Sequence, residues 1–266
     1  LYDHSGNQNH GTIIGATWQE VIPGCTDPYA ENYDENANLD DGTCSGYPDN
    51  GNYSLSFDGV DDYVESNDIL SLNDQFTISA LIKTESQDEW DGIISFESED
   101  GTDTELQIAL TGGESSFLRT EIFSNSASEH LWLNSTTTKI NDNVWHQIHL
   151  VFNKDNVDQV ILYVDGEIQS LVSQNESTND LITSFSISKK MLVGTSRNRL
   201  HNISGQIDNI KVWDVALTSE EVQLHLLNEP DNHAQGLLGS WKFNSGSGDI
   251  LYDHSGNQNH GTIVGA

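Results

Sequence analysis

Two groups of Asp and Asn residues have the types and spacing that suggest chemistry. Residues 3–11 read DHSGNQNHG, and residues 58–62 read DGVDD. Carboxylate and amide oxygens are the ligands of a hard cation such as calcium, and glycines let backbone carbonyls turn inward. Crowded carboxylates are costly unless a cation neutralises them. The expected calcium ligands in these loops are Asp3, Asn7, Asn9, Asp58, Asp61 and Asp62.

Two other interpretations of these loops remain open. The same oxygens accept hydrogen bonds from nearby backbone N–H groups in Asx turns, which would give a turn network without a metal. His4 and His10 suggest a transition metal instead, although they stand among oxygen donors without a thiolate.

Tryptophan rings are candidates for stacking on sugars. Trp90 and Trp132 fall in probable loops, so we expect these two to be glycan-binding residues. Trp145, Trp213 and Trp241 match strand positions instead, and we expect them in the core.

The elements that must position these groups are short strands. Apolar residues alternate with polar ones in several segments separated by stretches rich in Asn, Asp, Ser and Gly, as hairpin connections require. These segments are residues 53–57, 76–82, 148–152, 160–164 and 207–212. Many short strands at regular spacing predict an all-β fold, a two-sheet antiparallel jelly-roll sandwich.

One short helix is expected near the C-terminal side. Thr218 and Glu221 form a capping-box pattern, residues 222–227 supply apolar side chains, and Pro230 lies just beyond. A polar linker follows, and residues 237–243 then resemble a new strand.

The chain carries a long internal duplication. Residues 1–16, LYDHSGNQNHGTIIGA, and residues 251–266, LYDHSGNQNHGTIVGA, differ only at Ile14 and Val264. Chance does not produce 15 identities in 16 positions. Copies at the two ends predict a window, slightly longer than one period, of a tandem array.

Several segments together resemble the laminin G-like, concanavalin A-like jelly-roll family, whose relatives include the pentraxins. They are SLSFDGVDDYVE, FTISALIKT, VWHQIHLVFN, ILYVDGEIQ, GQIDNIKVWDVALTSEEV and LLGSWKFNSGSGDILYDHSGNQNHGTI, the last similar to the start of bacterial members. The resemblance implies two antiparallel sheets, often a calcium ion at the rim, and roles in adhesion or glycan binding. It supports calcium near the two acidic loops and adds Asp208 as a weaker ligand candidate.

Residues 24–44 interrupt the family pattern. They resemble a Cys-bounded, Asp/Asn-rich module of secreted proteins from marine Bacteroidetes-type bacteria, without the third Cys that commoner versions carry near Glu31. The resemblance implies a Cys25–Cys44 disulfide, whereas two thiols without histidine are too few for zinc. The alternating oxygens of this module begin like a calcium loop but lack the Gly and bidentate Glu of an EF-hand, which leaves Asx turns as the alternative. They belong to Asp34, Asn36, Asn38 and Asp40.

Catalysis is not expected. Glycoside hydrolases with this type of sandwich place Glu-x-Asp and a further Glu on one strand, because two carboxylates must flank the sugar bond. EWD at residues 89–91 and EPD at 229–231 begin the signature without finishing it. His146 and His149 lie on a predicted strand, and we expect His146 to be packed rather than a base.

The net charge of the chain limits the classes of partner that it can bind. The 42 Asp and Glu against 10 Lys and Arg give a net charge of -32, which repels phosphate backbones and anionic lipids. No apolar run approaches the ~20 residues that span a bilayer.

Taken together, the duplication, the resemblance and the charge lead us to expect a fragment of an extracellular, cell-surface or secreted tandem-repeat structural protein (a stalk, filament or giant adhesin) built from calcium-stabilised units. The alternatives are a calcium-dependent, lectin-like adhesion module, with surface glycans as partners, and a polysaccharide-recognising accessory domain of an enzyme.

The expected organisation follows from where the family pattern is cut. Residues 1–23 are early strands of a laminin G-like domain, 24–46 the Cys-bounded insertion, 47–228 the main body, 229–236 a linker and 237–266 the opening strands of the next repeat. Neighbouring copies of the repeat would then complete each other's sandwiches by strand addition. The rival expectation is closure within one unit, with residues 237–243 pairing beside 207–213.

Overall fold

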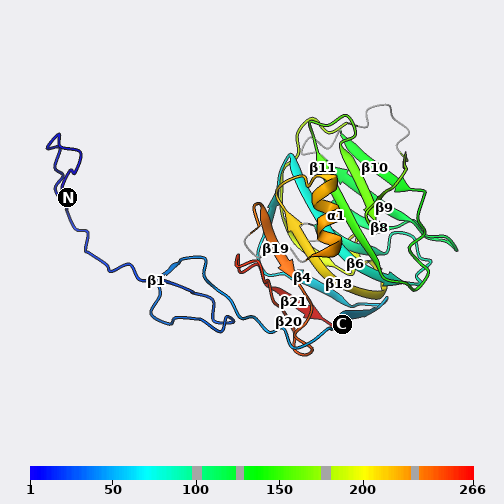
Figure 1. Cartoon of the computed structure of the whole chain (residues 1–266), viewed down its shortest axis with the longest axis horizontal. Coiled ribbons are helices and arrows are strands. Elements are labelled where there is room, and N and C mark those ends of the chain that lie inside the picture. The colour runs from blue at the N-terminus through cyan, green and yellow to red at the C-terminus, as the bar shows by residue number, and fades with distance from the viewer. Residues whose placement is uncertain (98–103, 124–128, 175–180, 229–233) are drawn as a thin grey trace. The chain divides into compact units, whose positions relative to one another are not determined.

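The chain divides into two units, Leu1–Cys44 and Ser45–Ala266. The computed structural model describes residues 1–97, 104–123, 129–174, 181–228 and 234–266 (Figure 1). The first unit is mostly coil. It contains two short parallel strands, β1 (Pro23–Gly24) and β2 (Leu39–Asp40). The second unit holds the remaining described strands and the helix.

A disulfide holds the small unit together. Cys25 and Cys44 are bonded, with their Cα atoms 4.7 Å apart, and both are buried. The predicted pairing is thus confirmed. Closing a loop of this length removes about 3 kcal/mol of unfolded-state entropy. The bond therefore stabilises a segment that has almost no regular secondary structure.

The larger sheet of the second unit is built from antiparallel neighbours, with one parallel contact between Asn202 and Gly92. Its strand order is β14 (Leu171–Ser173), β10 (His130–Ser135), β9 (Leu118–Phe123), β8 (Thr104–Leu110), β7 (Gly92–Glu97), β15 (Ile187–Val193), β4 (Tyr63–Ser66), β21 (Gly261–Val264) and β20 (Ile250–Leu251). β5 (Leu70–Leu72) adds to β15, and the hairpin of β16 (Thr195–Ser196) and β17 (His201–Asn202) joins β7.

The smaller sheet is antiparallel throughout its described pairs. Its order is β13 (Glu167–Ile168), β12 (Val160–Val164), β11 (His146–Asn153), β6 (Gln75–Thr84), β18 (Ser204–Trp213) and β19 (Leu237–Trp241). β3 (Leu55–Asp58) pairs with the first half of β18 and β19 with its second half. The alternation in the sequence correctly predicted these strands, and the turn at Asp165 and Gly166 adopts positive φ values of 52° and 80°.

The core lies between the two sheets. Inward-facing side chains such as Ile78, Leu150, Leu106 and Ile122 form one apolar cluster. Helix α1 (Ser219–Leu227) covers the opposite face of the smaller sheet, where its Val222 packs in a second apolar cluster (Figure 1). The predicted capping box is present. The sandwich with one short helix therefore agrees with the fold expected from the sequence.

The expected exchange of the terminal strands is wrong. Residues 237–241 pair with β18 of the same chain, with Ile210 opposite Trp241 and Lys211 opposite Ser240. β21 then pairs with β4, so residues 237–264 close this sandwich and do not open the next. Residues 1–22 form no strand, and residues 1–23 are therefore not early strands of the sandwich. A strand tethered to its own sheet has a high effective concentration there, which favours closure within one unit. Of the predicted linker, residues 229–233 lie outside the described part of the chain.

Candidate functional site

The outer face of the larger sheet carries charged and aromatic side chains. On β8, β9 and β10 the residues that alternate with the core ones point to this face, among them Gln107, Arg119, Glu121 and Trp132. Arg119 is 4% exposed and Glu121 1%, so these polar groups are buried although they lie outside the apolar core.

All three arginines of the chain lie on this face, which we call the arginine face. Arg119 projects from β9, and Arg197 and Arg199 follow β16. Arg197 donates to both carboxylate oxygens of Glu121, at 3.0 and 2.8 Å. Arg199 pairs with Glu65 and lies over the ring of Tyr63. The chain has 42 acidic residues and 10 basic ones, so three of its few cations lie on one sheet face.

Trp90 is held between two of these arginines. The guanidinium carbons of Arg119 and Arg197 lie 3.7 and 3.6 Å from the centre of its ring. Carbon atoms do not approach closer than about 3.5 Å without repulsion, so two groups this near the centre must lie on opposite faces of the ring. Guanidinium groups therefore cover both faces of the Trp90 ring, and its role in glycan binding stays a prediction.

Trp132 has a different position. Its ring lies 5.5 Å from that of Trp90, so the structure brings the two predicted glycan-binding residues together. It is half-buried, and the ring of His130 lies roughly parallel to it at 6.3 Å. Trp132 comes from β10 rather than from a loop. Its ring remains the candidate aromatic surface of this face.

Several polar atoms of the arginine face lack partners among the described residues. They are Nη1 of Arg119, Nε of Arg197, Nε1 of Trp132 and Oε1 of Gln107. A buried polar atom without a hydrogen bond costs about 1–3 kcal/mol, so an unpaired group is usually an indication of a bound water or ligand. Three buried donors and one buried acceptor around Glu121 therefore have no hydrogen-bond partner among the described residues.

The acid at the centre of this network has a shifted pKa. Burial raises the pKa of Glu121, while the charges of Arg197 and Arg119 lower it in part. Gln107 Nε2 donates to Glu121 Oε2 at 2.9 Å. Hydrogen bonds from Gln107 and Arg197 therefore fix the carboxylate of Glu121 on the outer face of the larger sheet. The carboxylate in turn holds Arg197 in place.

Backbone strain marks the segments that cover the face. Arg197, Asn198 and Arg199 have φ values of 49°, 65° and 59°, and Trp90 has 76°. Side chains other than glycine rarely adopt this left-handed region, and each instance costs of the order of 1–3 kcal/mol. Such strain persists where the surroundings over-determine it, which is typical of binding sites.

The sequence pattern did not reveal Arg119, Glu121 and Arg197 as site residues. Two signals were available. Arginine is scarce in the chain, and Arg119 and Glu121 occupy alternate positions between the apolar residues of one strand. What remained hidden was that residues 197–199 and Trp90 would cover the same sheet face.

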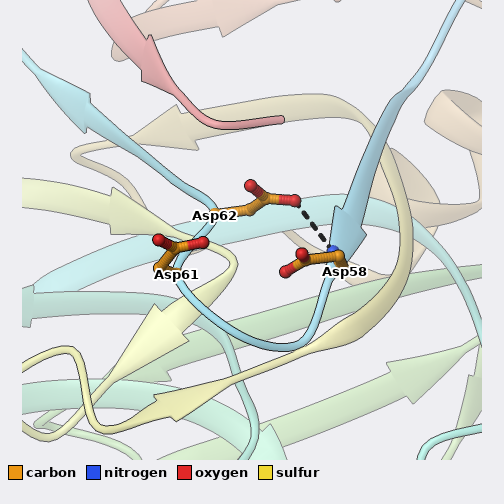
Figure 2. A group of neighbouring side chains, drawn as sticks. All are labelled: Asp58, Asp61 and Asp62. Atoms are coloured by element: carbon orange, nitrogen blue, oxygen red, sulfur yellow. Dashed lines mark hydrogen bonds between the residues drawn. The ribbon is translucent and has the colours of Figure 1, made fainter.

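A second candidate site is the acidic turn after β3. One carboxylate oxygen from each of Asp58, Asp61 and Asp62 lies within 4.8 Å of the others, and Figure 2 shows the three side chains around the turn. Asp62 Oδ2 accepts the backbone N–H of Asp58 at 2.9 Å, and Asp58 Oδ1 accepts that of Val60. This is the arrangement predicted from the sequence, with other carboxylate oxygens left over for a cation.

The chain directly after β21 runs past this acidic turn. A Cβ atom built on Gly265, which has a φ of 83°, would lie 2.1 Å from Asp62 Oδ1. No side chain fits at this position, so a glycine is required directly after β21. Asp208, the weaker calcium candidate, lies elsewhere, where it lines a pocket with Tyr53 and Trp145. Asp208 is not part of the acidic turn. Trp145 is 38% exposed, so the expectation that it lies in the core is wrong.

The duplicated loop uses its oxygens for hydrogen bonds. Asp3 Oδ1 accepts the N–H of Ser5 at 2.7 Å, and Oδ2 accepts that of Asn9 at 2.9 Å. The matching Asp253 accepts four hydrogen bonds in the sandwich. These contacts favour the turn network over the calcium site predicted at Asp3, Asn7 and Asn9.

The small disulfide-bonded unit behaves in the same way. Asp34 Oδ1 accepts the N–H of Asn36, Asn38 Oδ1 that of Ile22, and Asp40 Oδ1 that of Gly42. The contacts of Asp34 and Asp40 are Asx turns, the alternative to the predicted calcium ligands, whereas Asn38 bonds to a residue distant in the chain. Among the described residues, the only group of three carboxylates close enough to share a cation is the acidic turn.

The partial hydrolase signature near Trp90 is engaged in structural contacts. Glu89 pairs with Arg119 at 2.9 Å. Asp91 is buried and accepts a hydrogen bond from Ser86 Oγ, and burial raises its pKa to about 6. The second partial signature, at residues 229–231, lies outside the described residues.

No helix among the described residues is long and apolar enough to cross a membrane.

Comparisons with known proteins agree with the fold. The sequence model of the Laminin_G_3 family, of the concanavalin A-like lectin/glucanases superfamily, matches residues 58–223. A SAP-like pentraxin from Limulus polyphemus is similar at 17% identity and a TM-score of 0.50, over 64% of this chain and 79% of that one. A protein from Bacteroides ovatus that is thought to bind carbohydrate gives 14% and 0.55, over 80% of this chain and 59% of that one. No curated protein matches the sequence.

Proposed function

Since the chain belongs to the concanavalin A-like lectin/glucanases superfamily, we propose that its sandwich is a carbohydrate-binding module. The observation that supports this proposal most is the arginine face, where Trp132 lies beside the Arg119–Trp90–Arg197 stack. Sugar sites combine an aromatic surface with a few fixed polar groups that set orientation. The similar protein from Bacteroides ovatus, which is thought to bind carbohydrate, agrees with this function.

The charges of the face favour a neutral ligand. Arg119 pairs with Glu89, Arg197 with Glu121 and Arg199 with Glu65, so each guanidinium already has a carboxylate partner. What remains are oriented N–H donors and the amide oxygen of Gln107, which match the hydroxyl groups of a sugar. We therefore propose neutral glycans, rather than sulfated or carboxylated ones, as the ligand class.

Binding without hydrolysis is the second element of the proposal. A glycosidase needs one carboxylic acid and one carboxylate on the two sides of the bond to be cleaved. Glu89 and Glu121 are held by arginines, and Asp91 is buried against Ser86. These contacts support binding without hydrolysis. We propose no catalytic role for these three carboxyl groups.

Calcium at the acidic turn would stabilise the same sandwich. Asp58, Asp61 and Asp62 offer hard oxygen ligands, and a divalent ion would relieve their mutual repulsion. Because Gly265 packs against Asp62, such an ion would also hold the closing strand in place. The role proposed for calcium is therefore structural, and it is separate from the arginine face.

The setting we propose is an extracellular or cell-surface protein of repeated units. The disulfide favours an oxidising compartment, and the duplicated segment supports a repeat with a period of 250 residues. Repeated weak sugar sites would gain avidity on a surface that presents many glycans. This combines the spacer role and the binding role of the unit.

A glycan array with the full chain and matched tryptophan variants tests the binding function. Trp132→Ala should abolish binding to neutral glycans, because it removes the aromatic surface. Trp18→Ala is the control, since Trp18 is 85% exposed and belongs to the other unit. Equal binding by both variants would contradict the site, and selective binding of anionic glycans would contradict the neutral ligand class.

A further inference from the structure

The outer face of the smaller sheet carries a pocket beyond the part that helix α1 covers. Ala80 and Ile82 of β6 point into the core, so Leu81 between them points to the outer face. Here the surface holds a pocket of about 350 Å³, to which α1 contributes no residue. We call it the outer pocket. Its lining includes Tyr53, Leu81, Trp145, Gln206, Asp208 and Asn209.

A break in strand pairing opens the outer pocket. β3 pairs with the first half of β18 and β19 with its second half, so Asp208 and Asn209 pair with neither of these two described strands. On the other side of β18, three steps from Asp208 to Lys211 match two steps along β6, from Leu81 to Ser79. Asn209, in this bulge, has a left-handed φ of 50°. Bulges of this kind re-aim a side chain and are common beside binding sites.

Two aromatic rings border the outer pocket. Tyr53 is 48% exposed and Trp145 38%. The N–H of Tyr53 donates to Asn244 Oδ1 at 3.1 Å, and a Cβ atom built on Gly246 would lie 2.7 Å from the Tyr53 ring. The ring therefore packs directly against the Gly246 backbone. A group that is already fixed loses little conformational freedom when a ligand binds.

The charged group of the outer pocket is a buried carboxylate. Asp208 is 7% exposed, and its Oδ1 accepts the N–H of Asn209 at 2.7 Å. None of the described residues that line the pocket is basic. Lys211, the one basic residue of β18, is buried opposite Ser79 and is not part of the lining. A carboxylate beside aromatic rings attracts a cation and repels an anion.

The chain itself indicates which cation suits such a site. Among the described residues, the cations that lie over aromatic rings are all arginines: Arg119 and Arg197 over Trp90, and Arg199 over Tyr63. Each of them also pairs with a glutamate. The outer pocket offers the same combination of ring and carboxylate without an arginine. A planar guanidinium stacks on a ring and is more weakly hydrated than an ammonium group, which favours arginine over lysine.

We propose that the outer pocket binds an exposed arginine side chain of a partner protein. The guanidinium would lie against Trp145 beside the carboxylate of Asp208, with its aliphatic stem on Leu81. The net charge of -32 would raise the local concentration of a basic partner. Another copy of this chain does not supply the group, because its three arginines already pair with glutamates. The inference does not depend on glycan binding, since the arginine face lies on the other sheet.

NMR spectroscopy of the ¹⁵N-labelled full chain tests this proposal with the peptide acetyl-Gly-Arg-Gly-amide. The indole N–H signal of Trp145, assigned by its absence in Trp145→Phe, should shift with a dissociation constant on the order of 1 mM. The same peptide with citrulline in place of arginine keeps the shape without the charge, and it should bind about 10-fold more weakly. The lysine peptide should also bind more weakly than the arginine peptide, because an ammonium group does not stack on a ring.

Variants of the full chain separate the pocket from general attraction to an acidic surface. Trp145→Ala should weaken binding of the arginine peptide about 10-fold, and Asp208→Asn should do the same. Trp18→Ala, in the other unit, is the matched control and should bind like wild type. Trp145→Ala should keep its binding to neutral glycans, so this test and that of the arginine face fail separately. Equal binding of the three peptides, equal binding by Trp145→Ala, or no shift of the Trp145 signal at about 10 mM arginine peptide would overturn the proposal.

Discussion

Asp253 and Asp3 occupy the same place in two nearly identical sequences, which makes them a matched pair for mutation. Asp253 is 0% exposed and accepts hydrogen bonds from Ser240 N, Ser255 N, Ser255 Oγ and Asn259 N, all at 2.8–2.9 Å. Asp3 makes only the local bonds within its own loop. We expect Asp253→Ala to destabilise the sandwich and Asp3→Ala to leave it unchanged.

The magnitude follows from the bonds that are lost. Replacement by Ala leaves the N–H groups of Ser240 and Ser255 buried without partners, at about 1–3 kcal/mol each. Burial raises the pKa of Asp253, so the carboxylate itself is costly to bury and the net loss is smaller than the sum of its bonds. About 3 kcal/mol is expected, which for a domain of this size lowers the melting temperature by about 6–12 °C.

Thermal unfolding of dilute protein, followed by tryptophan fluorescence, measures this difference. Trp241 is buried beside the loop and donates to Asn259, so its emission should report the local environment directly. Asp3→Ala should change the free energy of unfolding by no more than about 0.5 kcal/mol, as substitutions at exposed positions usually do. Equal melting temperatures for the two variants would show that the buried hydrogen bonds do not stabilise the sandwich.

Three further perturbations address other charges. The raised pKa of Asp91, about 6, means that the folded state loses stability as the pH rises from about 4 through 6. Asp91→Asn should therefore raise the melting temperature at pH 7.5 but not at pH 4, and a gain at both would exclude the titration. His149 is buried with its pKa lowered to about 3, so stability should fall as the pH drops below 6.5. His149→Leu should flatten that dependence in urea titrations, and an unchanged slope would contradict it. Chelation should lower the melting temperature of wild type but not of Asp58→Asn/Asp61→Asn, as expected if calcium binds only the native state. A shift of equal size in both would place the ion elsewhere.

Local patterns in the sequence were sufficient for most of the fold. Apolar and polar residues alternate along a strand because one of its faces is buried, and a capping box involves residues three positions apart. Both patterns are therefore visible without tertiary information. Thr218 and Glu221 marked the start of the helix for this reason. The pairing of Cys25 with Cys44 rested on the resemblance of the module, and the structure agrees.

Long-range pairing was not visible in the same way. The alternation in residues 237–241 identified a strand but not the sheet that it joins, because any exposed strand edge offers the same backbone groups. The stack of Arg119, Trp90 and Arg197 joins three segments far apart in the chain. Its geometry also covers both faces of the Trp90 ring, a result that composition alone did not provide.

The burial of Glu121 distinguishes the arginine face from the exposed carboxylates of the surface. At physiological ionic strength the Debye length is about 8 Å, so the repulsion among the exposed carboxylates of this chain is largely screened by dissolved salt. Glu121 is 1% exposed, so the carboxylate that holds Arg197 is shielded from mobile ions. Changes in salinity should therefore alter how strongly one molecule repels another while leaving the geometry of Arg197 and Trp90 intact.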